Sequence, residues 1–316
     1  VRVIDPAGPG AGASGGIVGA LAPHVPENWN DKKAFQLDSL LMAEAFWAEV
    51  ADAGGGAPGY ARLGRIQPVM DAAALSLARA REAGAADLWR GAAIWRVEAA
   101  EGAWCPVSPT GHVIRDTLSA RIHPRRACAA LVAALHAKDA EVLREGRAAG
   151  CVVWATGAAG LEELSAGHTR AVGTGVKGQA ALLDLNACDA PQLFAGGIHI
   201  VPHADGTTAI GSTTEREYAD ATSTDAQLDA VIARARAAVP ALAEARVIDR
   251  WAGLRPRARS RSPMLGPHPL REGAFIANGG FKIGFGMAPM VGEVMADLIL
   301  DGTDRIPDGF RPEASM

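Results

Sequence analysis

The chain has 316 residues and a mass of 32.6 kDa; 49% of its residues are hydrophobic and 21% are charged. This composition excludes a mainly disordered chain, and the length suffices for one large α/β domain or for two interleaved domains with buried cores. The formal net charge of −4 excludes the overall basic surface typical of nucleic-acid-binding proteins, although a local basic loop remains compatible with it.

Cysteine spacing and apolar run length bear on where the protein works. No uncharged apolar run reaches the roughly 18 residues of a membrane-spanning helix, so we expect no transmembrane segment. The cysteines lie far apart and lack the spacing of a metal site, which predicts no metal and free thiols in a reducing, cytoplasmic compartment. They are Cys105, Cys128, Cys151 and Cys188.

The first residues predict one edge of a dinucleotide site. Val1 to Ile4 reads as a buried parallel strand that ends at Asp5. In a dinucleotide-binding βαβ unit, an acidic residue at this position binds the adenosine ribose and follows the G-x-G-x-x-G phosphate turn by about 20 residues. We therefore expect the phosphate turn upstream of Val1, and the nature of any upstream segment stays open.

A glycine-rich stretch follows Asp5. Gly10 to Gly16 is small enough for its backbone to approach a phosphate closely, and it includes Ser14 as a hydroxyl donor. We expect Asp5, Ser14, Gly15 and Gly16 to contact a cofactor, with a flexible surface loop as the alternative.

Five helices are expected, from apolar spacing and from capping residues. They cover residues 31–53, 71–86 and 124–137, a segment that begins with the Thr224-Asp-Ala-Gln227 capping box and runs to about Val239, and a last helix that begins near Pro289 and ends just before Gly302.

Strand-like runs lie between these helices, at residues 151–155, 197–201, 207–211, 247–251 and 274–277. Helices and strands alternate at both ends of the chain, whereas residues 171–213 are rich in strands and turns. This order predicts an α/β fold with an antiparallel sheet in a second domain inserted into the first. The strand at 151–155 ends in Thr156-Gly157, a small turn of the kind that lies beside ligands at the carboxyl ends of parallel strands.

Further motifs follow one another in the order and spacing of one enzyme family. They are Val3-Ile-Asp5, Gly12-Ala-Ser-Gly-Gly16, Ala22-Pro23, Val152-Val-Trp-Ala-Thr-Gly157, Val176-Lys-Gly-Gln179, Ile200-Val-Pro202, Ile210-Gly-Ser-Thr213, Trp251-Ala-Gly-Leu-Arg-Pro256 and Gly279-Gly-Phe-Lys-Ile-Gly284. With them, the chain resembles the glycine oxidase and D-amino-acid oxidase family of FAD enzymes along nearly its whole length.

This resemblance implies a fold and a cofactor. The fold would be a Rossmann-like FAD-binding domain, interleaved with an α+β substrate domain as in glutathione-reductase-like flavoproteins. The FAD-binding domain would comprise residues 1–58, 113–170 and 250–316, and the substrate domain residues 59–112 and 171–249. FAD would be bound non-covalently, because the segment from Gly279 to Gly286 has no cysteine to attach it.

The resemblance also implies roles for individual residues. Arg255 would clamp the substrate carboxylate, as a guanidinium fork can with two parallel hydrogen bonds. Lys282 and His199 would lie near the substrate, with a solvent-facing lysine and a structural histidine as alternatives. The loop beside the flavin ring would be Gly280-Phe281-Lys282-Ile283. The neighbouring Arg257, Arg259 and Arg261 are expected mainly to form a solvated basic loop.

The expected activity is oxidation of a small amino acid or secondary amine. The resemblance implies hydride transfer to the flavin, an imine that water hydrolyses, and hydrogen peroxide when oxygen is the acceptor. Two alternatives remain open: a flavin domain that modifies a wobble uridine of tRNA, which the arginine-rich loop favours and the net charge opposes, and a family member that does not catalyse a reaction.

Overall fold

The largest feature of the computed structural model, which describes all residues from Val1 to Met316, is an eight-stranded sheet. Its strands follow the order β13-β9-β12-β11-β10-β3-β5-β4, and every neighbouring pair is antiparallel except β10 and β3. The strands are β3 (Arg65–Pro68), β4 (Trp95–Ala99), β5 (His112–Asp116), β9 (Gly173–Asp184), β10 (Gln192–Ala195), β11 (Ile198–Pro202), β12 (Thr208–Gly211) and β13 (Arg246–Ala258). The sheet expected between residues 171 and 213 is therefore larger than predicted and recruits strands from both sides of that range.

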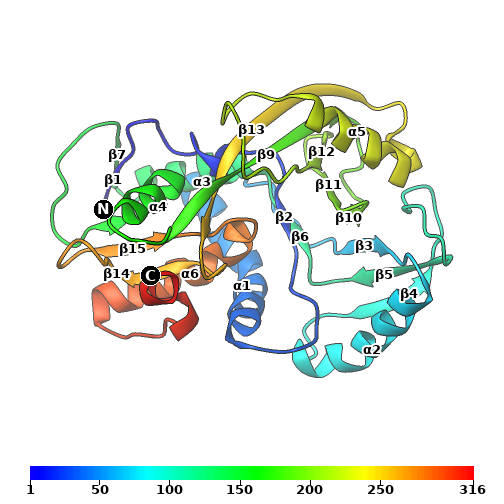
Figure 1. Ribbon diagram of the computed structural model, residues 1–316, viewed down its shortest axis with the longest axis horizontal. Helices are drawn as coiled ribbons and strands as arrows, with labels where there is room; N and C mark the ends of the chain where they lie inside the picture. The colour runs from blue at the N-terminus through cyan, green and yellow to red at the C-terminus, as the bar shows by residue number, and fades with distance from the viewer.

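Shorter strands lie in the part of the molecule that holds both chain ends (Figure 1). Strand β1 (Arg2–Ile4) pairs in parallel with β7 (Glu141–Leu143), and β8 (Val153–Trp154) pairs in parallel with β15 (Phe275–Asn278). Strand β14 (Met264–Pro267) adds to β15 in antiparallel orientation, and β2 (Ala20–Leu21) pairs with β6 (Ala120–Arg121) between the two parts. The two parallel pairs belong to separate small sheets, so the whole is a mixed α/β fold.

Three predicted helices match the structure closely: α1 (Asp31–Gly54), α2 (Ala72–Leu88) and α3 (Pro124–Ala137). Two others need correction. Helix α5 (Ala226–Ala238) is capped by the Asp225 carboxylate, which accepts the Gln227 N–H, so the expected Thr224 capping box is wrong. Helix α6 (Gly284–Asp301) begins before Pro289, which lies inside it. Helix α4 (Gly157–Ala166) was not predicted. Short 3-10 turns span Ala13–Gly15, Pro240–Leu242, Asp308–Phe310 and Pro312–Ser315.

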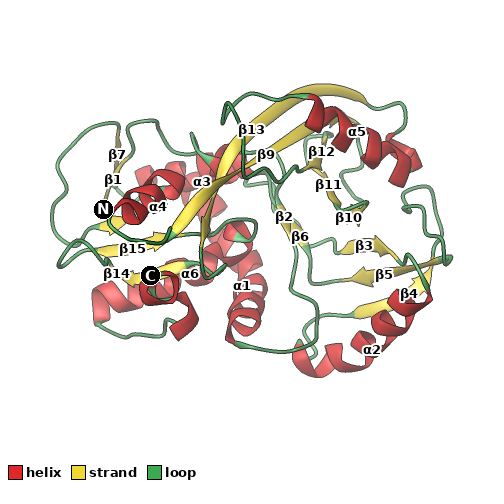
Figure 2. Ribbon diagram, in the orientation of Figure 1, coloured by secondary structure: helices red, strands yellow, loops and turns green.

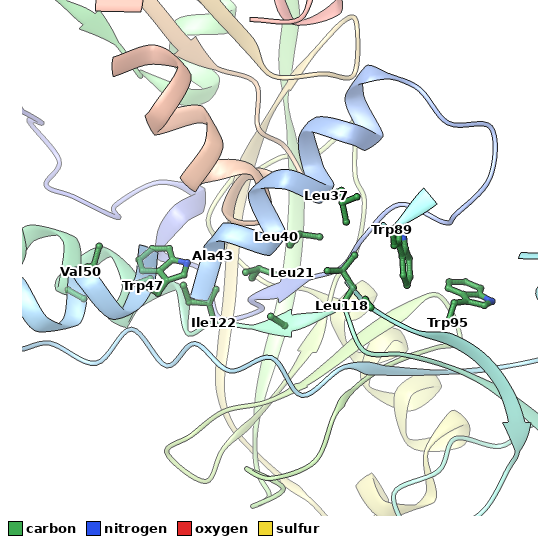
Figure 3. Close-up of a cluster of buried hydrophobic side chains, with 14 of the residues drawn as sticks. Leu21, Leu37, Leu40, Ala43, Trp47, Val50, Trp89, Trp95, Leu118 and Ile122 are labelled. Atoms are coloured by element: carbon green, nitrogen blue, oxygen red, sulfur yellow. The ribbon is translucent and has the colours of Figure 1, made fainter. Parts of the chain in front are cut away.

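Helix α5 lies beside β11 and β12, and α2 lies beside β4 at the other end of the large sheet (Figure 2). One core joins α1 and α3 to the segments around β2 and β6 and extends to α2, as the side chains in Figure 3 show. It includes Trp89, which is completely buried, and Trp47, which is almost completely buried. A core of this kind fixes how the two parts of the chain meet, because apolar burial contributes on the order of 25 cal/mol per Å².

A second core lies between α5 and one face of the eight-stranded sheet. Leu228, Val231 and Ile232 of α5 pack with strand residues such as Leu183 and Ile210. Successive side chains of a strand alternate between the two faces, so the neighbours of these residues point to the opposite face. None of the helices is both long enough and apolar enough to cross a membrane.

Candidate active site

The face of the sheet opposite α5 carries a row of residues that are direct partners across five strands. The row runs Phe194, His199, Gly211, Ala180, Trp251, from β10 to β13. Direct partners share one face. The middle of the row therefore carries only the small residues Gly211 and Ala180, which leave space above the sheet, and aromatic rings lie at its ends.

Arg255 lies on the same face of β13, which is an edge strand. Its Nη1 donates to the Ser212 hydroxyl at 2.7 Å, and its Nη2 donates to the carbonyls of Thr213 at 2.8 Å and Lys177 at 3.1 Å. Gly178 leaves the space for this arrangement, because a methyl group in place of its hydrogen would lie 2.7 Å from Arg255 Cζ. The guanidinium is thus held in one position by strands β9 and β13 and by the segment after β12.

The charge of Arg255 has no carboxylate partner within ion-pair distance. Its Nε is buried without an acceptor. Burial lowers the pKa of Arg255 to about 10, and the charge of Glu215 acts in the opposite direction. A positioned, partly desolvated guanidinium with an unused donor is suited to bind an anion.

The loop after β15 brings further positive charge to Arg255. The Phe281 N–H donates to the Pro256 carbonyl at 3.0 Å, which holds the aromatic ring beside β13. The ring centroid is 5.4 Å from Arg255 Cζ, 5.9 Å from Arg257 Cζ and 5.8 Å from Lys282 Nζ. Lys282 Nζ also donates to Thr214 Oγ1 at 3.1 Å.

His199 completes this side of the site. Its ring lies 4.7 Å from that of Phe194, and its Nδ1 is buried without a partner. Burial lowers the pKa of His199 to about 3, and the nearby charges of Arg65 and Lys282 lower it further. His199 is therefore neutral at ordinary pH and adds no positive charge to the site.

A buried polar network supports the segment that holds Arg255. Lys177 Nζ lies 3.6 Å from Glu215 Oε2, and both side chains are at most 4% exposed. The Gln179 amide donates to Glu215 at 3.0 Å and to Asp225 at 2.9 Å, and Glu215 also accepts from the Thr213 hydroxyl. Lys177 and Gln179 point to the face of the sheet opposite Arg255. The network therefore holds Thr213 from that opposite face.

The glycine-rich stretch forms a tight loop instead of a phosphate turn. Gly10 to Gly15 spells G-x-G-x-x-G, but it forms only a 3-10 turn and leads into β2, without the helix that such a motif requires. A side chain on Gly15 would collide with the Gly10 carbonyl. Gly16 packs against Trp251, since a methyl group on it would lie 3.3 Å from the indole ring.

Asp5 and Thr156 lie at strand ends, as expected. One Asp5 carboxylate oxygen accepts the N–H groups of Ala7 and Gly8 at 3.1 and 3.2 Å, so part of this side chain closes its own turn. Thr156 is exposed and directly precedes α4, and the Gly157 carbonyl accepts from Asn278 at 2.9 Å. This hydrogen bond ties the Thr156-Gly157 turn to the loop that carries Phe281.

The residues present fit FAD at two places. A cavity of about 550 Å³ opens beside the glycine-rich loop and α3, where Gly10, Gly15 and Arg125 are among its lining residues. Its volume is within the roughly 300–1,000 Å³ usual for ligand sites. The N-terminus of α6, after Gly280 and Ile283, has no side-chain cap, so its N–H groups are available to an electron-rich ring.

Of the residues singled out in the sequence, the structure places Arg255 and Lys282 around the ring of Phe281, with His199 close to Lys282. Asp5 lies apart from them, beside the β1·β7 pair. Arg259 and Arg261 are exposed, whereas Arg257 is half-buried and joins the cluster. The expectation that Arg257 belongs to a solvated loop is therefore wrong, and the sequence assigned no role to Ser212 or to the Lys177 network. The spacing of Arg255 and Arg257, which places both on one face of a strand, was an available signal for Arg257.

Comparisons with known proteins identify related sequences and related folds. The chain is 35% identical over 134 residues to glycine oxidase of Pseudomonas aeruginosa, an alignment that covers 42% of this chain and 36% of the relative. It is 34% identical over 144 residues to glycine oxidase of Pseudomonas putida, covering 45% and 39%. The matched segments thus span little more than a third of these relatives.

Solved structures resemble the fold over a much greater length. Iminodiacetate oxidase from Chelativorans sp. BNC1 superposes with a TM-score of 0.85 and 21% identity, covering 99% of this chain and 92% of that one. Glycine oxidase from Geobacillus kaustophilus gives a TM-score of 0.82 and 21% identity, with 98% and 91% covered. The sequence profile of the FAD dependent oxidoreductase family that includes D-amino-acid oxidase matches residues 1–298, and the chain belongs to that family.

Proposed function

We propose that this protein oxidises an amino acid or a secondary amine with FAD as its cofactor and releases an imine and, with oxygen as acceptor, hydrogen peroxide. The observation that carries the proposal is the environment of the Arg255 guanidinium. Its guanidinium is positioned by three acceptors, is partly desolvated and has no carboxylate partner, on a face floored by glycine and alanine. A substrate carboxylate would supply the missing counter-charge.

Each residue has a definite task in this proposal. Arg255 binds the substrate carboxylate and thereby orients the carbon that carries the amine. Bound FAD would supply the two-electron acceptor for hydride from that carbon, so no dedicated protein base is required. Phe281 excludes water beside the guanidinium, and Lys282 adds positive charge at the exposed edge. His199 stays neutral and contributes shape instead of charge.

We propose that FAD is bound non-covalently by residues on two sides of the molecule. The flavin ring would lie beside Gly280-Phe281-Lys282-Ile283 and the start of α6, with Thr156 and Gly157 next to it. Ser14, Gly15 and Gly16 would contact the remainder of the cofactor, with Asp5 near the ribose. The uncapped helix and the cavity beside the glycine-rich loop support this assignment.

We also propose that the chain folds into two interleaved domains. The parallel pairs β1·β7 and β8·β15 support a Rossmann-like FAD-binding domain of the glutathione-reductase type, made of residues 1–58, 113–170 and 250–316. The substrate domain would comprise residues 59–112 and 171–249. Strands β5 and β13 cross the boundaries near residues 113 and 250 within the eight-stranded sheet, so the domains share that sheet at these points.

The names of the related proteins narrow the substrate class. Glycine and iminodiacetate each have an amine nitrogen one carbon away from a carboxylate. We extend this arrangement to the substrate of this chain. The test uses the FAD-loaded, full-length protein under anaerobic conditions. Glycine, N-methylglycine or a D-amino acid is added, and the absorbance of the oxidised flavin is followed. We expect bleaching by at least one of them and none by methylamine or dimethylamine. Equal bleaching by amines without a carboxylate would refute the proposal.

A further inference from the structure

Three cations surround Phe281, although a single carboxylate needs only one arginine fork. Arg255, Arg257 and Lys282 each have their charged group within 6 Å of the ring centroid. Arg255 and Arg257 are two residues apart on β13 and therefore share its ring-facing side. Phe281 is fixed between them by its hydrogen bond to Pro256.

None of the three cations has an ion pair within the protein. Lys282 donates only to a threonine hydroxyl, and Arg257 makes no side-chain hydrogen bond. Other arginines of the same strand are paired: Arg246 with Asp184 at 2.9 Å, and Arg250 with Asp229 at 2.6 Å. Glu215, the carboxylate whose charge acts on Arg255, is paired with Lys177 on the other side of β9. The absence of counter-charges is thus specific to the part of β13 that faces Phe281.

Unpaired cations held close together raise the energy of the free protein. Burial lowers the pKa of Lys282, and the charges of Arg255 and Arg257 lower it further. Cation–π contact with one phenyl ring offsets this repulsion only in part, because each such contact contributes about 0.5–1 kcal/mol at exposed sites. One bound carboxylate would still leave two positive charges without a partner.

We propose that the substrate carries a second carboxylate, which Arg257 and Lys282 bind while Arg255 holds the first. The substrate class is then an amine with a carboxylate on each side of the nitrogen or at the end of a short side chain. The flat fork of Arg257 matches a carboxylate, and Lys282 adds a point charge at the exposed edge. This inference rests on the proposed function, because it takes Arg255 as the binding site of the first carboxylate.

The test uses two unreactive ligands that differ by one carboxylate. Oxydiacetate has an ether oxygen between two carboxymethyl groups, and methoxyacetate has a methyl group in place of one carboxymethyl group. Their dissociation constants would be measured by titration calorimetry with the full-length, FAD-loaded protein. We expect oxydiacetate to bind roughly tenfold or more tightly than methoxyacetate, with the stronger dependence on salt.

Variants separate the two anion sites. Arg257→Gln and Lys282→Gln should each weaken oxydiacetate binding several-fold more than methoxyacetate binding, whereas Arg255→Lys should weaken both. Arg261→Gln, which removes an exposed arginine of the same segment, is the matched control and should preserve the ratio.

The outcomes distinguish this inference from the proposed function. If methoxyacetate binds in an Arg255-dependent way but oxydiacetate binds no better, only the second carboxylate is refuted. If Arg257→Gln and Lys282→Gln leave the ratio unchanged, the assignment of these residues is refuted. If neither ligand binds, or if Arg255→Lys changes nothing, the proposed function fails as well.

Discussion

Arg255 Nη1 donates to the Ser212 hydroxyl at 2.7 Å, and this contact joins edge strand β13 to the segment that follows β12. The two residues are 43 positions apart in the sequence. The proposed anion site is therefore assembled from separate segments, and its geometry depends on how the sheet holds them.

Replacement of Ser212 tests whether this hydrogen bond positions Arg255. Ser212→Ala removes one acceptor, and a hydrogen bond to a charged group contributes about 1.5–3 kcal/mol. We expect KM for the amine substrate to rise roughly tenfold, with a much smaller change in kcat. Ser76→Ala on the exposed surface of α2 is the control and should change neither value. An unchanged KM in Ser212→Ala would show that the other acceptors of Arg255 suffice.

The ion pair between Lys177 and Glu215 predicts a large effect on stability. Lys177→Met leaves Glu215 buried without its partner, which should lower the free energy of unfolding by about 3–5 kcal/mol. The double variant Lys177→Met/Glu215→Gln should recover more than half of that loss, because the buried charge is gone.

Urea denaturation of the single and double variants measures both values. The control is Arg246→Met, which breaks the exposed pair between Arg246 of β13 and Asp184, at the other end of β9 from Lys177. It should cost less than about 1 kcal/mol. Equal losses in Arg246→Met and Lys177→Met would show that the buried pair has no special role.

Replacement of Gly178 tests whether ligand binding depends on the space that this glycine leaves for the Arg255 guanidinium. In Gly178→Ala the new methyl group would lie 2.7 Å from Arg255 Cζ, so the guanidinium must move. We expect the dissociation constant of methoxyacetate to rise at least several-fold. Gly292→Ala, on α6 with no neighbour within 4 Å, should leave binding unchanged and raise stability by about 0.5–1 kcal/mol. Normal binding by Gly178→Ala would contradict the position assigned to the guanidinium.

His203 predicts how stability changes with pH. Its Nε2 lies 2.8 Å from the Ile17 carbonyl, and burial lowers its pKa to about 4 from the ordinary 6.5. Between these values the unfolded chain binds the proton and the folded chain does not. The contribution of neutral, buried His203 to the free energy of unfolding is therefore fully present above pH 6.5 and is lost progressively as the pH falls toward 4.

The loss should approach about 1.4 kcal/mol per pH unit for each such histidine. In His203→Gln, whose amide can still donate to Ile17, the free energy of unfolding should fall less steeply between pH 6.5 and 4. Parallel curves for the two proteins would exclude His203 as a source of acid sensitivity.

The sequence predicted local elements better than the pairing of distant ones. Helix α3 was predicted with its exact bounds because Pro124 occupies the first helical position, where a missing N–H costs nothing. The same reasoning failed at Pro289, which lies within α6. Strand β13 was predicted for five residues but extends over 13, because the run of Val, Ile and Trp typical of a strand ends at Trp251. Pro256 is tolerated there since β13 is an edge strand.

The site was predictable to a similar degree. The family resemblance pointed to Arg255 and Phe281, which the structure places together. Lys177 and Glu215 were not found, because a charged residue in a strand ordinarily indicates a solvent-exposed face, and only the tertiary pairing of β9 with the segment after β12 buries them. Arg257 was assigned to a solvated loop for the same reason.

The kinetic effect of removing the Arg255 guanidinium tests the central claim most directly. The FAD-loaded protein and its Arg255→Ala and Arg261→Ala variants would be compared with the best amine substrate, together with their flavin content. We expect Arg255→Ala to keep its flavin and to raise KM about a hundredfold, since loss of a buried charge partner costs roughly 2–5 kcal/mol. Added guanidinium ion should restore part of the activity, and Arg261→Ala should behave as the wild type. An unchanged KM in Arg255→Ala would contradict the account.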